Sequence, residues 1–133
     1  MSKSSEKSLE TILVVEDEQI VRQLVQKVLE SHGYKVLEAS NGEEAIEISQ
    51  QHTGIIHLLL SDMVMPGMSG PELAERLKES RSDMKVLYMS GYTEYALVSQ
   101  GVMERVTSFI WKPFSTEALA AKVREVLSLP AED

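Results

Sequence analysis

Short apolar runs alternate along the chain with longer segments in which apolar residues return every three or four positions. A continuous apolar run is typical of a strand buried on both faces of a sheet, whereas the longer repeat is typical of a helix with one buried face. This pattern predicts five strands, at 11–15, 35–39, 55–61, 85–89 and 107–111. Each strand is followed by a segment that predicts a helix.

The helix signals also give approximate ends. In the first helix Ile20, Leu24 and Val28 recur every four residues, with further apolar residues beside them, and Gly33 ends the helix. The second helix is predicted from a cap at Asn41 to about residue 51, and the third opens at Pro71. A short helix over 93–100 and a last helix capped by Ser115 complete the series.

Strands that alternate with helices favour a parallel sheet with right-handed crossovers and helices on both faces. We therefore predict an α/β fold, a flavodoxin-like doubly wound sheet of five β-α units with strand order 2-1-3-4-5. One domain is expected at 11–128, after a disordered leader at 1–10 and before a C-terminal tail at 129–133.

Composition narrows the function classes. The 133 residues include no cysteine, so disulfides, thiolate nucleophiles and cysteine-based zinc sites are excluded. A formal net charge of −8 argues against a surface that binds the phosphates of nucleic acids. The apolar runs are shorter than the roughly 20 residues that a membrane span needs. These features favour a soluble, cytoplasmic protein without direct nucleic-acid or membrane contacts.

Polar residues follow four of the predicted strands. Glu16 and Asp17 follow the first, Asp62 the third, Ser90 the fourth and Lys112 the fifth. Because open parallel sheets bind ligands outside the carboxyl ends of their strands, these side chains are expected to converge. Three close carboxylates repel one another unless a cation neutralises them, and oxygen ligands suit Mg²⁺, with Mn²⁺ as a substitute.

The same set suits phosphoryl chemistry. One carboxylate can attack phosphorus as a nucleophile, while the Ser90 hydroxyl and the Lys112 ammonium bind phosphoryl oxygens. Each residue alone has a simpler interpretation: Glu16 and Asp17 as an acidic turn, Asp62 as a turn residue, Lys112 as a solvated lysine. Their joint placement at four strand ends favours the combined site.

The segments that carry these residues resemble the receiver domains of two-component response regulators. The resemblance covers about 11–127 and rests on LVVEDE at 13–18, SDMVMPGMSG at 61–70, MSGY at 89–92 and WKPF at 111–114. It implies that Asp62 is the phosphoacceptor and that Glu16, Asp17, Asp62 and the backbone carbonyl of Val64 bind Mg²⁺. It also implies that Ser90 and Lys112 contact the phosphoryl group.

Further expectations follow from the resemblance. The Lys112–Pro113 bond would be cis, and Phe109 would turn inward as Ser90 moves toward the phosphoryl group. In the family, Tyr is more frequent at the position of Phe109, and Thr is more frequent at the position of Ser90. The surface formed by strand 85–89, helix 93–100 and strand 107–111 would then change. Two copies of the chain could pair through helix 93–100, strand 107–111 and the last helix.

The resemblance implies a phosphorelay switch with weak autophosphatase activity rather than an enzyme. The donor would be a phosphohistidine on a histidine kinase or a histidine phosphotransfer domain. The sequences at 69–73 and 89–93 most resemble those of receivers appended to hybrid sensor histidine kinases, but a stand-alone regulator could carry the same sequences. Kinase activity is expected only if the chain is a fragment of such a hybrid kinase.

Two other classes of protein share parts of this pattern. A haloacid-dehalogenase-like phosphatase also uses an aspartyl phosphate, but its nucleophile should follow the first strand in an Asp-x-Asp pattern, and this chain has Asp17, Glu18 and Gln19 there. A flavodoxin-like cofactor carrier needs a phosphate loop at that position, where Glu16 to Glu18 would repel phosphate instead. Turnover of phosphate esters would favour the first rival, and flavin absorbance the second.

Overall fold

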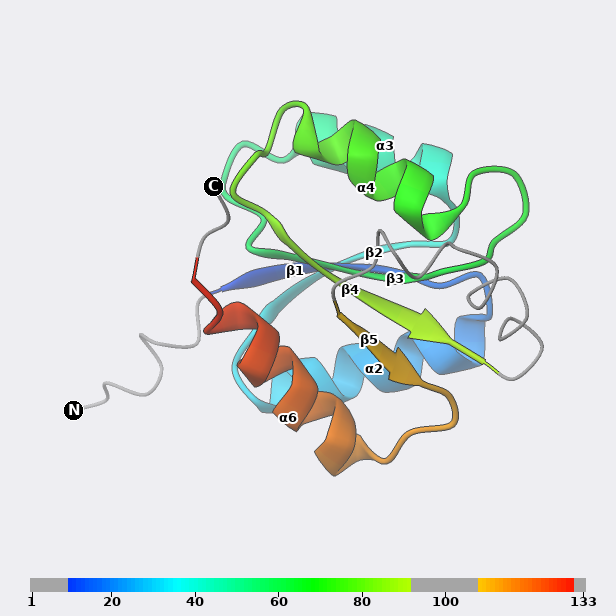
Figure 1. The fold of residues 1–133 in the computed structure, drawn as a ribbon, viewed down its shortest axis with the longest axis vertical. Coiled ribbons are helices and arrows are strands. Elements are labelled where there is room, and N and C mark those ends of the chain that lie inside the picture. Colours follow the sequence, from blue (N-terminus) through cyan, green and yellow to red (C-terminus); the bar gives the residue numbers. More distant parts are fainter. Residues whose placement is uncertain (1–9, 92–107, 131–133) are drawn as a thin grey trace.

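The computed structural model describes residues 10–91 and 108–130. Its centre is a parallel five-stranded sheet with the order β2-β1-β3-β4-β5, which confirms the predicted fold class and strand order (Figure 1). The strands are β1 (Thr11–Val15), β2 (Lys35–Ala39), β3 (Leu58–Asp62), β4 (Lys85–Ser90) and β5 (Phe109–Trp111).

Helices cover both faces of this sheet (Figure 1). Helices α3 (Gly42–Gln51) and α4 (Gly70–Lys78) lie on one face, and α2 (Gln19–Ser31) and α6 (Thr116–Leu127) lie on the other. Because successive strand residues point to opposite faces, the central strands supply two cores. Leu13 and Leu59 belong to the core on the α3 and α4 side, whereas Val14 and Leu60 belong to the core on the α2 and α6 side.

Helix ends follow the predicted capping signals. The Asn41 side chain accepts a hydrogen bond from Glu44 N, and the Ser115 hydroxyl accepts one from Ala118 N. The third helix begins at Gly70 rather than at the predicted Pro71, and Ser69 and Glu72 form a reciprocal capping box there. These contacts fix where α3, α4 and α6 begin, and hence the loops that leave β2, β3 and β5.

The buried face of α2 differs from the predicted repeat. Val25, Val28 and Leu29 are buried, whereas Ile20 is 81% exposed and Leu24 is 48% exposed. The helix turns about 100° per residue, so Ile20 and Leu24 stand one position away from the stripe that contacts the sheet. Of the apolar residues that repeat every four positions, Val28 is therefore buried, whereas Ile20 and Leu24 form an exposed apolar pair on α2.

Several predicted boundaries also differ from the structure. Strand β3 begins at Leu58 rather than at residue 55, and Ile55 is 67% exposed. The last strand begins at Phe109 rather than at residue 107. The predicted helix over 93–100 and most of the predicted leader at 1–10 lie outside the described residues, so the domain limits at 11 and 128 stay predictions.

An arginine ties the far ends of α3 and α4 together, at the edge of the sheet where the strands begin. Arg81 Nε donates to the Ser49 hydroxyl at 2.8 Å, and its other guanidinium nitrogens donate to backbone carbonyls of Ser49, His52 and Gly54. Arg81 therefore holds the end of α3 and the segment that leads into β3 by structural hydrogen bonds. Among the helices at 10–91 and 108–130, none has the length and apolar character that crossing a membrane requires.

Candidate functional site

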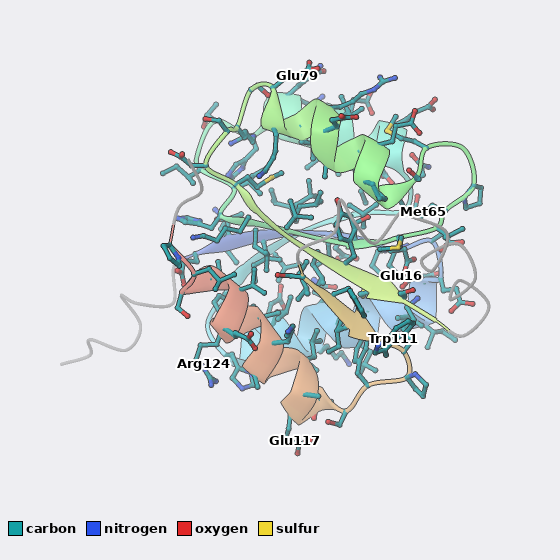
Figure 2. All side chains as sticks on the ribbon, viewed as in Figure 1. Glu16, Met65, Glu79, Trp111, Glu117 and Arg124 are labelled. Atoms are coloured by element: carbon teal, nitrogen blue, oxygen red, sulfur yellow. The ribbon has the colours of Figure 1, made fainter. Side chains whose placement is uncertain are left out.

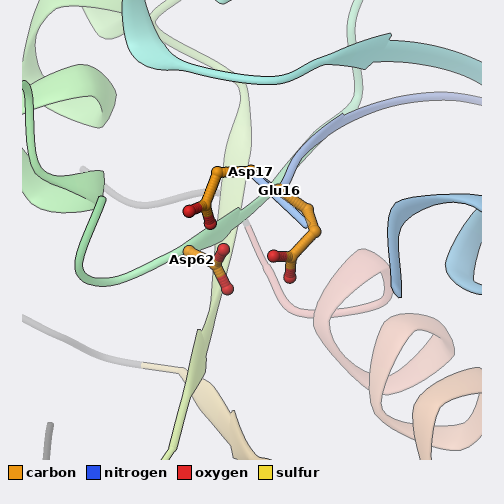
Figure 3. Close-up of side chains that lie close together, drawn as sticks. All are labelled: Glu16, Asp17 and Asp62. Atoms are coloured by element: carbon orange, nitrogen blue, oxygen red, sulfur yellow. The ribbon is translucent and has the colours of Figure 1, made fainter. Parts of the chain in front are cut away.

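Three carboxylates meet at the edge of the sheet where the strands end. Glu16 follows β1 and is fully buried, Asp62 ends β3 and is 2% exposed, and Asp17 is exposed. One oxygen atom from each of the three lies within 4.8 Å of the others, and Figure 3 shows the carboxylates turned toward a common space. The predicted convergence of Glu16, Asp17 and Asp62 is thus seen in the structure.

The turn after β1 is held by its neighbours. Glu16 N donates to the Ala39 carbonyl of β2 at 3.1 Å, and Arg22 Nη1 from α2 donates to the Glu16 carbonyl at 2.7 Å. Glu16 Oε2 accepts a hydrogen bond from Glu18 N at 3.0 Å. The backbone of Glu16 is therefore held by β2 and α2, and one of its carboxylate oxygens is held by the β1–α2 turn.

Lys112 brings a positive charge into this acidic group. Its Nζ lies 2.7 Å from Asp62 Oδ1 and 2.9 Å from Glu16 Oε1. Its backbone N donates to the Ser90 carbonyl at 2.7 Å, which fixes the end of β5 against β4. The Lys112–Pro113 bond is cis, as expected. Lys112, predicted from the end of the fifth strand, thus reaches carboxylates that follow the first and third strands.

The negative charges of Glu16, Asp17 and Asp62 outnumber the single positive charge of Lys112. Burial and the nearby Glu16 carboxylate raise the pKa of Asp62 to about 8, although Lys112 acts in the opposite direction. Burial lowers the pKa of Lys112, but its close contacts with the Asp62 and Glu16 carboxylates more than offset this, so that the Lys112 pKa is raised. Lys112 therefore keeps its proton, and one ammonium does not compensate the clustered carboxylates.

The donor set fits a hard divalent cation. It offers carboxylate oxygens, of which Asp17 is open to solvent, and Mg²⁺ prefers a few carboxylates together with waters. Within the described part of the chain, the buried atoms Asp62 Oδ1 and Ser90 Oγ lack a hydrogen-bond partner. Asp62 Oδ1 makes its 2.7 Å contact with Lys112 as an ion pair, outside the geometry of a directed hydrogen bond. Ser90 Oγ is thus available to a ligand, whereas Asp62 Oδ1 is held by Lys112, with which a bound cation would compete.

The remaining predicted residues lie around this group. Ser90 ends β4 and is fully buried, and Val64 lies in the β3–α4 loop and is 37% exposed. Phe109 begins β5, packs against the core beneath α3 and α4, and stacks edge-on against Trp111 with ring centroids 5.0 Å apart. Figure 2 shows Trp111 at the same end of the sheet as Glu16. The metal role of the Val64 carbonyl and the switch role of Phe109 stay predictions.

Two neighbours of Asp62 contact its backbone carbonyl, and the sequence pattern predicts neither contact. The Ser61 hydroxyl donates to the Asp62 carbonyl at 2.8 Å, and Gly70 at the start of α4 approaches the same carbonyl closely. The sequence does indicate that Ser61 makes a hydrogen bond, because it ends a run of leucines in a buried strand, where its hydroxyl needs a partner. The approach of Gly70 depends on the path of the β3–α4 loop, which periodicity does not predict.

Comparisons with known proteins agree with this geometry. Residues 12–124 match the family described as "Response regulator receiver domain". Sensor kinase CckA of Brucella abortus (strain 2308) is 41% identical over 117 residues, which are 88% of this chain but 12% of CckA. Response regulator receiver protein CpdR of the same organism is 34% identical over 119 residues, which are 90% of this chain and 98% of CpdR.

Solved structures give the same assignment. The receiver domain from hybrid histidine kinase CckA superposes with a TM-score of 0.74 at 36% identity, covering 89% of this chain and 99% of that domain. Chemotaxis protein CheY4 of Vibrio cholerae superposes with a TM-score of 0.77 at 26% identity, covering 90% and 99% of the two chains. The chain therefore belongs to the receiver domains of two-component response regulators.

Proposed function

We propose that this receiver takes a phosphoryl group from a phosphohistidine onto Asp62, in a reaction that depends on Mg²⁺. The observation that carries the proposal is the meeting of Glu16, Asp17, Asp62 and Lys112 at one edge of the sheet. Receivers work with histidine kinases or histidine phosphotransfer domains, and one relative of this chain is a sensor kinase. The donor is therefore a phosphohistidine on such a protein.

Asp62 has the position that a nucleophile requires. One of its carboxylate oxygens attacks phosphorus, the bond from phosphorus to the histidine nitrogen breaks, and an acyl phosphate forms on Asp62. Glu16, Asp17, Asp62 and the Val64 carbonyl would hold the Mg²⁺ ion. When bound, the ion supplies positive charge to the carboxylates and to the phosphoryl oxygens. Mn²⁺ would substitute.

Lys112 and Ser90 complete the site. The Lys112 ammonium, now held by two carboxylates, and the buried Ser90 hydroxyl donate hydrogen bonds to phosphoryl oxygens on which negative charge is spread during transfer. A Ser90 hydroxyl that turns toward the phosphoryl group makes room for Phe109 to turn inward. The surface around β4 and β5 then changes and relays the signal.

A direct test uses a small phosphodonor. The protein is incubated with acetyl phosphate and Mg²⁺, and its intact mass is followed. We expect one phosphoryl group per chain, stable in acid and labile in base, and none when EDTA removes divalent cations. Sustained release of inorganic phosphate without a phosphorylated protein would instead indicate a phosphatase.

The exposed pair on α2 lies beside the site and suits the phosphodonor protein. Ile20 follows Asp17 by three residues, and it and Leu24 stand one helical turn apart on the surface of α2. Ile20→Asp should slow transfer from a phosphorylated histidine phosphotransfer domain about tenfold, because it places a charge in a surface that contact would desolvate. Uptake from acetyl phosphate should not change.

Ile55→Asp is the matched control, because Ile55 is also an exposed isoleucine but precedes β3 at the opposite edge of the sheet. Stopped-flow or quenched-flow transfer assays compare the two variants. Equal rates for Ile20→Asp and the wild type would contradict the assignment of α2 as the donor surface.

The lifetime of the acyl phosphate is expected to be long, with weak autophosphatase activity. Val64 stands two residues after Asp62 and carries no polar group that could orient an attacking water. Val64→Glu or Val64→Asn should shorten the lifetime about tenfold or more, since water-positioning groups typically contribute about 10²–10⁴-fold. Val64→Ala controls for the loss of bulk. Decay is followed by intact mass after the donor is removed, and a longer lifetime in Val64→Glu would contradict the prediction.

The biological context of the receiver is also a proposal. Either a stand-alone regulator or a hybrid histidine kinase could contain this domain, because the chain spans nearly all of CpdR but 12% of CckA. Kinase activity would belong only to the second case. A cytoplasmic location fits either context. Pairing of two copies through residues 93–100, β5 and α6 stays a prediction, since the first of these segments lies outside the described residues.

A further inference from the structure

Ser61 is a polar residue within the apolar run of β3. It is fully buried, and it follows Leu58, Leu59 and Leu60, which are also fully buried. Its hydroxyl donates to the backbone carbonyl of Asp62 at 2.8 Å. This bond joins neighbouring residues and is separate from the hydrogen bonds between strands. The hydroxyl therefore acts on the backbone of the residue that we propose as the phosphoacceptor.

The peptide group after Asp62 is held from other sides as well. Met63 N donates to the Met89 carbonyl of β4 at 2.9 Å, and Gly70 N donates to the Met63 carbonyl at 2.9 Å. A Cβ at position 70 would lie 2.2 Å from the Asp62 carbonyl oxygen, so α4 starts as close to this carbonyl as a glycine permits. Ser61, Met89 and Gly70 together leave the backbone after Asp62 little freedom to rotate.

This restraint matters because the Asp62 side chain is short. Two rotatable bonds separate its carboxylate from the backbone, so a rotation of the backbone moves the carboxylate almost directly. Its oxygens have to stay 2.7 Å from Lys112 and close to Glu16 and Asp17. We infer that Ser61 is a positioning residue, whose hydroxyl fixes the backbone at Asp62 and so aims the carboxylate at the phosphorus atom. The inference rests on the proposed function of Asp62.

A purely structural role for Ser61 makes a different prediction. A serine that only satisfies its own hydroxyl in the core affects the stability of the fold and not the reactivity of the folded protein. Ser49 provides the comparison. It is also a buried serine with one side-chain hydrogen bond, from Arg81 Nε, and it lies at the other end of the molecule. Ser49→Ala reports what the loss of such a bond does to stability alone.

The experiment compares Ser61→Ala, Ser61→Thr and Ser49→Ala with the wild type in the full chain. Urea unfolding gives the stability of each variant. Uptake from acetyl phosphate is then measured at a temperature where every variant is folded, in saturating Mg²⁺, over a range of donor concentrations. This design separates the maximal rate from the donor concentration at half-saturation, and both from metal binding.

We expect the maximal rate of Ser61→Ala to fall about tenfold with little change in half-saturation, because a misplacement of about 1 Å can cost about 10²-fold in rate. Ser61→Thr, which keeps the hydroxyl, should recover most of the rate, and Ser49→Ala should react like the wild type. A Ser61→Ala rate equal to that of Ser49→Ala, or no recovery in Ser61→Thr, would overturn the inference. No uptake by the wild type would overturn the proposed function of Asp62 instead.

Discussion

Asp62→Asn should take up no phosphoryl group and, without divalent cations, should be more stable than the wild type near neutral pH. The first effect is expected because an amide oxygen is a poor nucleophile. The second follows from the raised pKa of Asp62, since burial and the Glu16 carboxylate disfavour a negative charge there. Each unit of pKa shift corresponds to about 1.4 kcal/mol, and pH 7 lies about three units above the ordinary pKa of Asp62, so we expect a gain of up to about 4 kcal/mol.

The pH dependence gives this prediction its sign. The pKa of Asp62 is higher in the folded protein, about 8, than its ordinary value of 3.8, so the folded state holds the proton more tightly than the unfolded chain. This contribution to stability is full below about pH 4 and is lost as the pH rises to about 8. Asp62→Asn lacks it. The difference in unfolding free energy between variant and wild type should therefore grow across this range.

Urea unfolding in EDTA at several pH values measures that difference, and intact mass after incubation with acetyl phosphate and Mg²⁺ measures uptake. Adding Mg²⁺ should stabilise the wild type by mass action and Asp62→Asn much less. A variant that still acquires a base-labile phosphoryl group would show that another residue is the acceptor. A difference in stability that shrinks between pH 4 and 8 would show that the Asp62 charge is not disfavoured in the fold.

Topology explains why so much of the site could be predicted from the sequence. Strand order and the parallel direction place the ends of β1, β3, β4 and β5 at one edge, so residues far apart in sequence had to meet there. Glu16 and Lys112 are 96 positions apart in the sequence, yet Lys112 Nζ lies 2.9 Å from Glu16 Oε1. Runs such as that at 11–15 predicted strands because their residues are buried on both faces.

The misplaced features depend on neighbours rather than on periodicity. Ile20 and Leu24 repeat with Val28, but α2 contacts the sheet through Val25, Val28 and Leu29 and leaves Ile20 and Leu24 exposed. Ile55 extends the apolar run of the third strand, yet pairing with β1 begins at Leu58, which aligns with Ile12. The register of a parallel pair follows from both strands and the helix between them, and neither run alone determines it.

Lys112→Met should bind Mg²⁺ more tightly than the wild type and yet take up the phosphoryl group about 10²–10³-fold more slowly. Methionine keeps much of the side-chain volume but removes the ammonium that lies against Asp62 and Glu16. Without it, an added cation no longer competes with Lys112 for the same carboxylates, and the metal-free protein loses stability through their repulsion. Uptake slows because a donor to the phosphoryl oxygens is gone.

Calorimetry with Mg²⁺ and uptake from acetyl phosphate at saturating Mg²⁺ measure the two effects separately, so the slower uptake cannot come from poor metal binding. Lys122→Met is the matched control. Lys122 forms an ion pair with Glu125 on the surface of α6, at 3.6 Å, and its removal should change neither quantity. Opposite changes in metal affinity and rate at Lys112 would be difficult to obtain from a general loss of structure, which lowers both. If Lys112→Met instead binds Mg²⁺ more weakly than the wild type, Lys112 supports the metal site rather than competing with it, and the arrangement proposed for the carboxylates is wrong.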